Sequence, residues 1–228
     1  MDKISELEKR IKITFKNKDL LLEALTHRSY LNERSDWKLD HNERLEFLGD
    51  AVLELAVTEH LFKNYKEPEG VLTTWRAALV NSNMLSAMAY KFDLNEFLLL
   101  SRGESKDTGR ARQYILANTF EALIGAIYLD QGYERAKDFV DSFVLTELEK
   151  VIENKLYRDA KSTFQEQAQE RTGITPTYEV LEDWGPDHAK NFKIGVYLGS
   201  ELIGLGQGLS KQEAEQKAAQ DALHKKKW

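Results

Sequence analysis

The chain has 228 residues, with 32 lysines and arginines against 38 aspartates and glutamates, so its net charge is −6 at pH 7. It has no cysteine and no apolar run long enough to cross a bilayer, which excludes a disulfide framework and thiolate metal sites and predicts a cytoplasmic protein. The acidic balance argues against a uniformly basic nucleic-acid binder, although a local basic patch could still bind RNA.

The first 150 residues are expected to be helical. Apolar residues recur at helical spacing in four runs, which are 20–25, 45–62, 71–90 and 114–129. Polar or glycine-containing breaks separate these runs, and one of them, 101–112, is expected to be a surface loop. Its basic residues are candidates for contacts to phosphates; these are Arg102, Lys106, Arg110 and Arg112. The pattern predicts an all-α first domain over residues 1–153.

An acidic stripe marks the second helical run. Glu43, Glu46 and Asp50 follow one another at spacings of three and four residues, so on a helix they share one face. Asn42 precedes them as a candidate N-cap. The apolar residues around them indicate a buried helix; these are Leu45, Phe47, Leu48, Val52, Leu53 and Leu55. Carboxylates crowded beside a core repel one another unless a cation neutralises them, and a hard divalent metal such as Mg²⁺ prefers oxygen ligands.

A second pair of oxygen ligands lies in the fourth helical run, where Asn118 and Glu121 are three residues apart. Two buried helices that each present oxygen ligands predict one shared metal site. The pattern alone leaves a salt-bridged core and a solvated helix face open as alternatives. His27 is a candidate general base, but a single histidine in an amphipathic helix is more often a hydrogen-bonded structural residue.

The pattern changes after residue 154. A helix over 162–171, capped by Ser162 or Thr163, is followed by alternating segments typical of strands at 177–181, 191–198 and 201–206. Ser210 then caps an alanine-rich helix that runs to residue 224. This order predicts a small α+β domain of α-β-β-β-α topology over residues 161–228, joined to the first domain by a linker over 154–160.

Three segments together resemble the ribonuclease III family. Residues 42–53, NERLEFLGDAVL, are similar to the family signature. Residues 24–30, ALTHRSY, resemble its first-helix motif, and residues 115–130, ILANTFEALIGAIYLD, resemble its second acidic motif. The α-β-β-β-α unit resembles the double-stranded-RNA-binding domain that follows the nuclease domain in bacterial members. Order and spacing agree along the whole chain.

The resemblance implies a role for each acidic residue. Glu46, Asp50, Asn118 and Glu121 match the ligands of Mg²⁺, for which Mn²⁺ is expected to substitute. Asp50 and Glu121 also match the catalytic carboxylates, and Glu43 matches a supporting glutamate near the rim of the site. Two metal ions held by carboxylates activate water and stabilise charge during phosphodiester hydrolysis.

The resemblance also implies a homodimer that binds double-stranded RNA. Phe47 matches a residue that plugs into the partner subunit, and Glu69 matches one near the dimer interface that faces the partner's active site. The RNA contacts expected in the C-terminal unit are Gln165, Glu166, His188, Lys190 and Lys211. Cleavage is expected to leave 5′-phosphate and 3′-hydroxyl ends with short 3′ overhangs, in rRNA processing and mRNA turnover.

Asn118 departs from the family pattern, which usually has an aspartate ligand at this position. An amide oxygen can ligate Mg²⁺ but contributes no charge. The rest of the site is intact, so an active endoribonuclease is predicted. The alternative is a catalytically impaired protein that binds double-stranded RNA without cutting it.

Overall fold

The structure is a computed structural model that describes residues 3–153, 159–186 and 190–228. These residues form two compact units, one on each side of the gap at 154–158. The first unit is helical and the second is α+β, which confirms the predicted fold class. Most of the predicted linker over 154–160 lies outside the described residues, and Ala160 already belongs to a helix.

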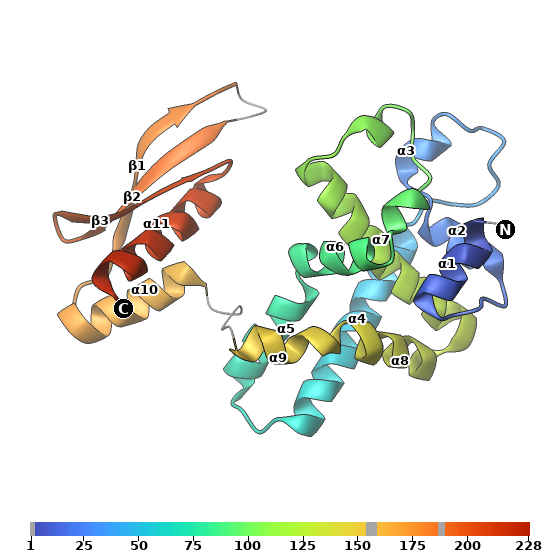
Figure 1. Cartoon of the computed structure of the whole chain (residues 1–228), viewed down its shortest axis with the longest axis horizontal. Coiled ribbons are helices and arrows are strands. Elements are labelled where there is room, and N and C mark those ends of the chain that lie inside the picture. The colour runs from blue at the N-terminus through green and yellow to red at the C-terminus, as the bar shows by residue number, and fades with distance from the viewer. Residues whose placement is uncertain (1–2, 154–158, 187–189) are drawn as a thin grey trace. The chain divides into compact units, whose positions relative to one another are not determined.

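Helices make up the first unit (Figure 1). The α-helices are α1 (Lys3–Ile11), α2 (Lys18–Ala24), α3 (Arg28–Leu31), α4 (Glu43–Asn64), α5 (Glu69–Val80), α6 (Ser82–Lys91), α7 (Arg110–Gln131), α8 (Tyr133–Phe143) and α9 (Leu148–Glu153). Short 3₁₀ turns are η1 (Leu94–Glu96), η2 (Glu104–Lys106) and η3 (Leu145–Glu147). An isolated parallel bridge joins Thr26 to Leu99.

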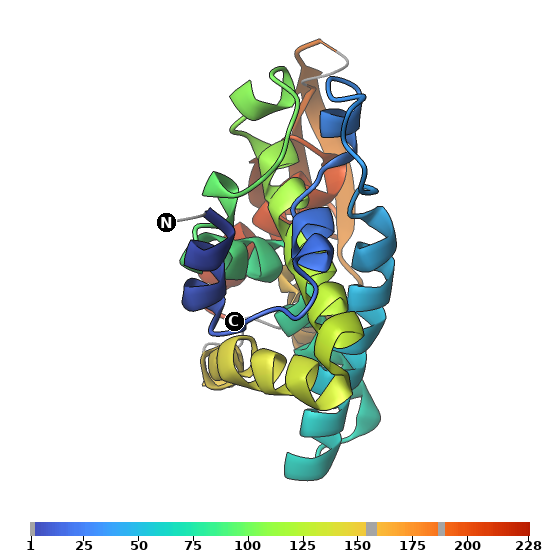
Figure 2. The same cartoon turned by 90° about the vertical axis from the view of Figure 1, so that its right-hand side faces the viewer.

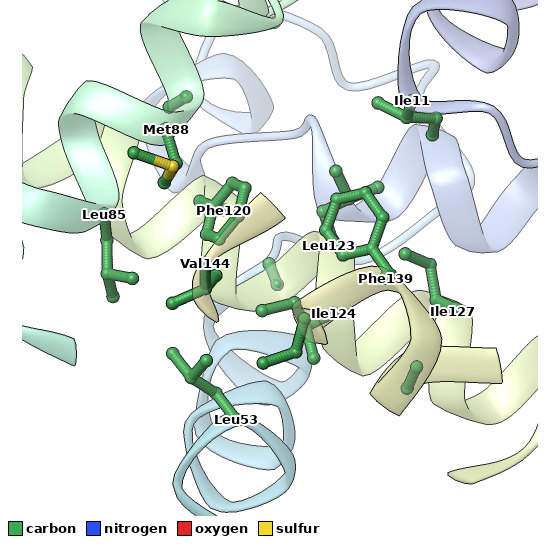
Figure 3. Packing of buried hydrophobic residues seen from close by; sticks show 14 of the residues in the cluster. Ile11, Leu53, Leu85, Met88, Phe120, Leu123, Ile124, Ile127, Phe139 and Val144 are labelled. Carbon is green, nitrogen blue, oxygen red and sulfur yellow. The ribbon is translucent and has the colours of Figure 1, made fainter. Parts of the chain in front are cut away.

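Helices α4 and α7 form the centre of this unit, and Figure 2 shows them side by side. Each has 22 residues. Figure 3 shows how α7 supplies the middle of the hydrophobic core through Phe120, Leu123 and Ile124, against which Leu53 of α4 and Met88 of α6 pack. Burying a side chain of this size stabilises the fold by about 1.5–3 kcal/mol. The core therefore holds both central helices firmly in place.

The structure adds a break to one helical run and corrects the expected burial of another. The run at 71–90 is two helices, because Asn81 adopts an extended ψ of 157° and its side-chain oxygen accepts a hydrogen bond from the backbone N of Met84 at 3.0 Å. Apolar periodicity continues across this break and therefore hides it. Helix α4 was expected to be buried, but the side chains of Phe47 and Leu55 are 82% and 55% exposed. Only one face of α4 packs in the core.

The second unit is a three-stranded antiparallel sheet covered on one face by two helices. Its elements are α10 (Ala160–Thr172), β1 (Thr177–Trp184), β2 (Asn191–Leu198), β3 (Glu201–Gly208) and α11 (Lys211–Lys226), with strand order β1-β2-β3. Phe164, Ile194, Val196 and Ala218 lie in its core. Neither Ser162 nor Thr163 caps α10. Asp159 does, since its carboxylate accepts a hydrogen bond from the backbone N of Lys161 at 3.1 Å.

No helix within the described residues is long and apolar enough to cross a membrane.

Candidate active site and RNA-binding surface

Two glycines let α4 and α7 cross at backbone contact. A Cβ atom added at Gly49 would lie 1.8 Å from the backbone O of Glu121, and one added at Gly125 would lie 2.3 Å from the backbone O of Leu45. Both distances are far below van der Waals contact, so a side chain at either position would force the helices apart. The crossing therefore sets the spacing between Asp50, which follows Gly49, and Glu121, which lies one turn before Gly125.

Four of the predicted site residues lie at this crossing. Glu46 and Asp50 are one turn apart on α4, and Asn118 and Glu121 are three residues apart on α7. Asn118 donates a side-chain hydrogen bond to Glu46, and the charge of Asp50 acts on both Glu46 and Glu121. Asp50 is exposed and the other three are half-buried. We refer to Glu46, Asp50, Asn118 and Glu121 as the acidic group.

Burial and like charges perturb the acidic group. Burial, followed by the negative charges of Asp50 and Glu46, raises the pKa of Glu121 to about 7. Burial also raises the pKa of Glu46, and the charges of Glu43 and Asp50 add to the rise, whereas the hydrogen bond from Asn118 opposes it. Raised carboxyl pKa values indicate negative charge that the protein itself does not compensate, which is typical of functional sites.

The donor atoms of the acidic group fit a hard divalent cation, because Mg²⁺ and Mn²⁺ bind carboxylate and amide oxygens. In the described part of the chain, no three Asp, Glu or His side chains are gathered closely enough to form a ready metal site. Carboxylates without a counter-ion repel one another, so these side chains are expected to spread until a cation draws them together.

Asn118 makes a hydrogen bond within the acidic group where an aspartate would add a repulsive charge. Its amide donates to the carboxylate of Glu46. An ionised aspartate has no proton to donate, and at the same position it would repel Glu46. The amide therefore relieves part of the charge crowding at the α4–α7 crossing.

Glu43 lies at the edge of the acidic group. Its carboxylate is exposed and forms an ion pair with Arg28 at 3.4 Å. The predicted cap before it, Asn42, makes no side-chain cap hydrogen bond; its amide donates to the backbone O of Ala24 at 3.4 Å. Asn42 therefore ties the start of α4 to the end of α2.

His27 has a structural place. It is the N-cap of α3, its Nδ1 lies 2.8 Å from the Oγ of Ser29, and its backbone N donates to the O of Leu99. Burial lowers the pKa of His27, so the neutral ring that a cap requires is favoured. These contacts support the structural alternative for His27.

The exposed apolar residues of α4 form a stripe. Phe47, Leu55 and Phe62 are 82%, 55% and 79% exposed, and their spacings of eight and seven residues place them on one helix face. A hollow of about 680 Å³ adjoins Phe47; its lining includes Leu20, Arg44 and Leu129. We refer to Phe47, Leu55 and Phe62 as the apolar stripe.

Glu69 is not part of the acidic group within one chain. It is the exposed first residue of α5, and it shares a hollow of about 670 Å³ with Phe62 and Arg76 beside the last turns of α4. The helix from Asp50 to its last residue, Asn64, extends about 21 Å at 1.5 Å per residue. Glu69 therefore lies at the far end of the apolar stripe.

The predicted RNA contacts of the second unit lie on several elements. Gln165 and Glu166 are exposed on α10. Lys211 is the exposed first residue of α11, which Ser210 caps by accepting a hydrogen bond from the backbone N of Glu213. Lys190 precedes β2 and is half-buried. His188 lies outside the described residues.

The basic segment at 101–112 differs from the expectation at one residue. Arg112 is buried, and its guanidinium donates to the backbone O of Glu104 at 2.7 Å and of Asp107 at 3.0 Å. It therefore braces the loop and is not free to track phosphates. Arg102, Lys106 and Arg110 are exposed.

Sequence reasoning missed three residues that shape the site. Gly49 and Gly125 are the contact points of the helix crossing, and Arg28 pairs with Glu43. A glycine inside an apolar helix is a signal of close packing, so the first two were detectable in principle. Arg28 was not, because its pairing with Glu43 depends on how α3 lies against α4.

Two family models match the chain. One, described as Ribonuclease-III-like, covers residues 17–148, and the other, described as the double-stranded RNA binding motif, covers residues 160–226. The chain belongs to the ribonuclease III family. Both matches agree with the two units of the fold, and the first contains the whole acidic group.

Curated relatives extend over nearly the full chain. Ribonuclease 3 of Natranaerobius thermophilus is 47% identical and covers 97% of this chain and 96% of its own length. Ribonuclease 3 of a Sulfurovum species is 45% identical and covers 98% of each. The nuclease domain of ribonuclease III from Campylobacter jejuni is a similar solved structure, with 43% identity, a TM-score of 0.56, and coverage of 64% of this chain and 96% of that one.

These relatives identify the chain as a ribonuclease III-type endoribonuclease with a double-stranded-RNA-binding domain. Members of this family are metal-dependent nucleases. The comparisons do not favour the alternative of an RNA-binding protein without nuclease activity.

Proposed function

We propose that this family member cleaves double-stranded RNA with Mg²⁺ as the natural metal and Mn²⁺ as a substitute. The observation that carries the proposal is the acidic group, in which burial and the charges of neighbouring carboxylates on two crossing helices raise the pKa of Glu46 and Glu121. Glu46, Asp50, Asn118 and Glu121 would hold the metal. When bound, the metal supplies an activated water and stabilises the charge that develops during phosphodiester hydrolysis.

The residues of the chain have distinct tasks in this proposal. Asp50 and Glu121 are the proposed catalytic carboxylates, with Asp50 exposed and Glu121 half-buried at the crossing. Glu43 supports the rim through its ion pair with Arg28. Products with 5′-phosphate and 3′-hydroxyl ends and short 3′ overhangs, and roles in rRNA processing and mRNA turnover, are part of the proposal. Access to such RNA calls for a cytoplasmic location.

We further propose that the enzyme is a homodimer formed through the apolar stripe. Large exposed apolar patches on a folded protein mark interaction sites, and the stripe has two exposed phenylalanines on one helix. The Campylobacter jejuni nuclease domain has a region involved in dimer formation. Phe47 would enter the partner subunit, and Glu69, at the far end of the stripe, would then face the partner's acidic group.

In the second unit, we propose that Gln165, Glu166 and His188 contact the minor groove of the duplex and that Lys190 and Lys211 contact phosphates. The supporting observations are the exposure of Gln165 and Glu166 and the position of Lys211 at a capped helix N-terminus, where the helix dipole favours anions.

Cleavage of a long synthetic RNA duplex in Mg²⁺ tests the nuclease proposal. The unmodified chain and the control Glu149→Gln, which changes an exposed carboxylate on α9, are expected to cut. Glu121→Gln is expected to bind the duplex without cutting it. If the unmodified chain binds duplex and leaves it intact, while Asn118→Asp restores cutting, the impaired alternative holds.

A further inference from the structure

Two lysines of the second unit meet at one aromatic ring. The Nζ of Lys190 and the Nζ of Lys211 each lie 5.9 Å from the ring centroid of Phe192. The two ammonium groups are therefore at most 11.8 Å apart. Lys190 lies two residues before Phe192, whereas Lys211 belongs to another element. A cation within about 6 Å of an aromatic face is attracted by the ring quadrupole.

The fold places Lys211 at this ring through a glycine. In the sheet, Phe192 pairs with Gly208 on β3. A Cβ atom at Gly208 would lie 2.8 Å from the backbone N of Ala214 in the first turns of α11. The missing side chain lets the start of α11 rest directly on the strand beside Phe192. The ring thus has a fixed neighbour at the N-terminus of a 16-residue helix.

Lys190 has a second partner, the carboxylate of Asp183. Its Nζ lies 3.2 Å from a carboxylate oxygen of Asp183, the residue that pairs with Phe192 across β1 and β2. Lys217, the next lysine on α11, is paired with Glu213 at 2.9 Å. No ion pair of Lys211 is found among the described residues. Among the residues that the structure describes, the ring therefore gathers one cation without a carboxylate partner and one that is paired with Asp183.

We propose that Phe192 is a positioning residue for phosphate binding, whose ring holds Lys190 and Lys211 as a paired clamp, and that Asp183 competes with RNA for Lys190. This inference rests on the proposed binding of double-stranded RNA by the second unit. The ring limits the rotamers of two flexible side chains before RNA arrives, so less conformational entropy is lost on binding. A phosphate that binds Lys190 displaces Asp183.

The test is the salt dependence of duplex binding by the full chain. Fluorescence anisotropy in EDTA, with an RNA duplex of about 20 base pairs, measures affinity without cleavage, since one such domain spans roughly 16. Phe192→Leu keeps an apolar side chain and removes the ring face, and Phe192→Tyr keeps the ring. Phe192→Leu is expected to weaken binding about three- to tenfold. The salt slope, which is the slope of log affinity against log salt concentration, is expected to become shallower by roughly one to two. Phe192→Tyr is expected to bind like the unmodified chain.

Two further variants distinguish a role of Phe192 in positioning the lysines from a role in folding. In a Lys190→Met, Lys211→Met background, Phe192→Leu is expected to have no further effect, because the ring then has no cation to hold. Asp183→Asn leaves the ring intact and is expected to tighten binding about two- to fivefold, the range of a surface ion pair.

The outcomes divide cleanly. Three results would each overturn the inference. Phe192→Leu could weaken binding without changing the salt slope, or weaken binding equally in the background that lacks both lysines. Asp183→Asn could leave the affinity for duplex unchanged. An unmodified chain that fails to bind duplex would instead overturn the proposed RNA binding itself.

Discussion

The substitution Gly125→Ala tests whether backbone contact between α4 and α7 sets the geometry of the acidic group. The added Cβ would start 2.3 Å from the backbone O of Leu45, about 1 Å short of ordinary contact. Overpacking of this severity lowers the free energy of unfolding by about 3 kcal/mol, and the better helix propensity of alanine offsets about 1 kcal/mol of that loss. The net loss of about 2 kcal/mol should lower Tm by about 4–8 °C. A shift of about 1 Å between the two catalytic carboxylates should slow cleavage roughly 100-fold.

Thermal unfolding by circular dichroism and single-turnover cleavage of an RNA duplex measure the two effects. The stability control is Gly70→Ala on α5, where an added Cβ meets no atom within 4 Å. Its Tm should be unchanged or slightly raised, since alanine is the better helix former. If Gly125→Ala keeps both the Tm and the cleavage rate of the unmodified chain, the helix crossing is not what positions the acidic group.

Three other predictions concern single residues. Glu121→Gln should raise the free energy of unfolding of the metal-free protein more at pH 8 than at pH 5, by about 1–2 kcal/mol after a discount for partial exposure. The reason is that a carboxyl pKa raised from 4.5 to about 7 lowers the stability of the unmodified chain as pH rises through that window. Equal effects at both pH values in urea unfolding would contradict this. Phe47→Asp should convert the proposed dimer to a monomer in analytical ultracentrifugation. The control Leu202→Asp, which changes an exposed leucine of the second unit, should not. If Phe47→Asp stays dimeric, the apolar stripe is not the dimer interface. Asn118→Asp should lower the Mg²⁺ concentration needed for half-maximal cleavage about 10-fold or more. The substitution adds an anionic ligand and removes the hydrogen bond to Glu46. An unchanged Mg²⁺ requirement would show that position 118 does not ligate the metal.

The fold class and the members of the acidic group were predictable because both are local patterns. The spacing of Glu46 and Asp50 on one helix, and of Asn118 and Glu121 on another, places each pair on one face whatever the tertiary structure. The alternating segments of the second unit predicted its strands for the same reason.

What escaped prediction depends on contacts between distant segments. The apolar pattern of α4 does not distinguish the face that meets α7 from the face that carries Phe47, since both are hydrophobic. Arg112 looked like a phosphate ligand because nothing local indicates that it reaches back to carbonyl groups eight and five residues earlier. The break at Asn81 was hidden because leucines and alanines continue on both sides of it.

The length of helix α4 would have a mechanical consequence in the proposed dimer. It carries Glu46 and Asp50 near one end and the apolar stripe along its outer face, so it acts as a single rod of about 33 Å. Any tilt of this rod pivots at Gly49, where its backbone touches α7. A tilt of about 5° would move Phe62, about 20 Å from that pivot, by about 1.7 Å, but Asp50 by only about 0.1 Å. Assembly through the apolar stripe would therefore leave the spacing of the metal ligands as the helix crossing sets it.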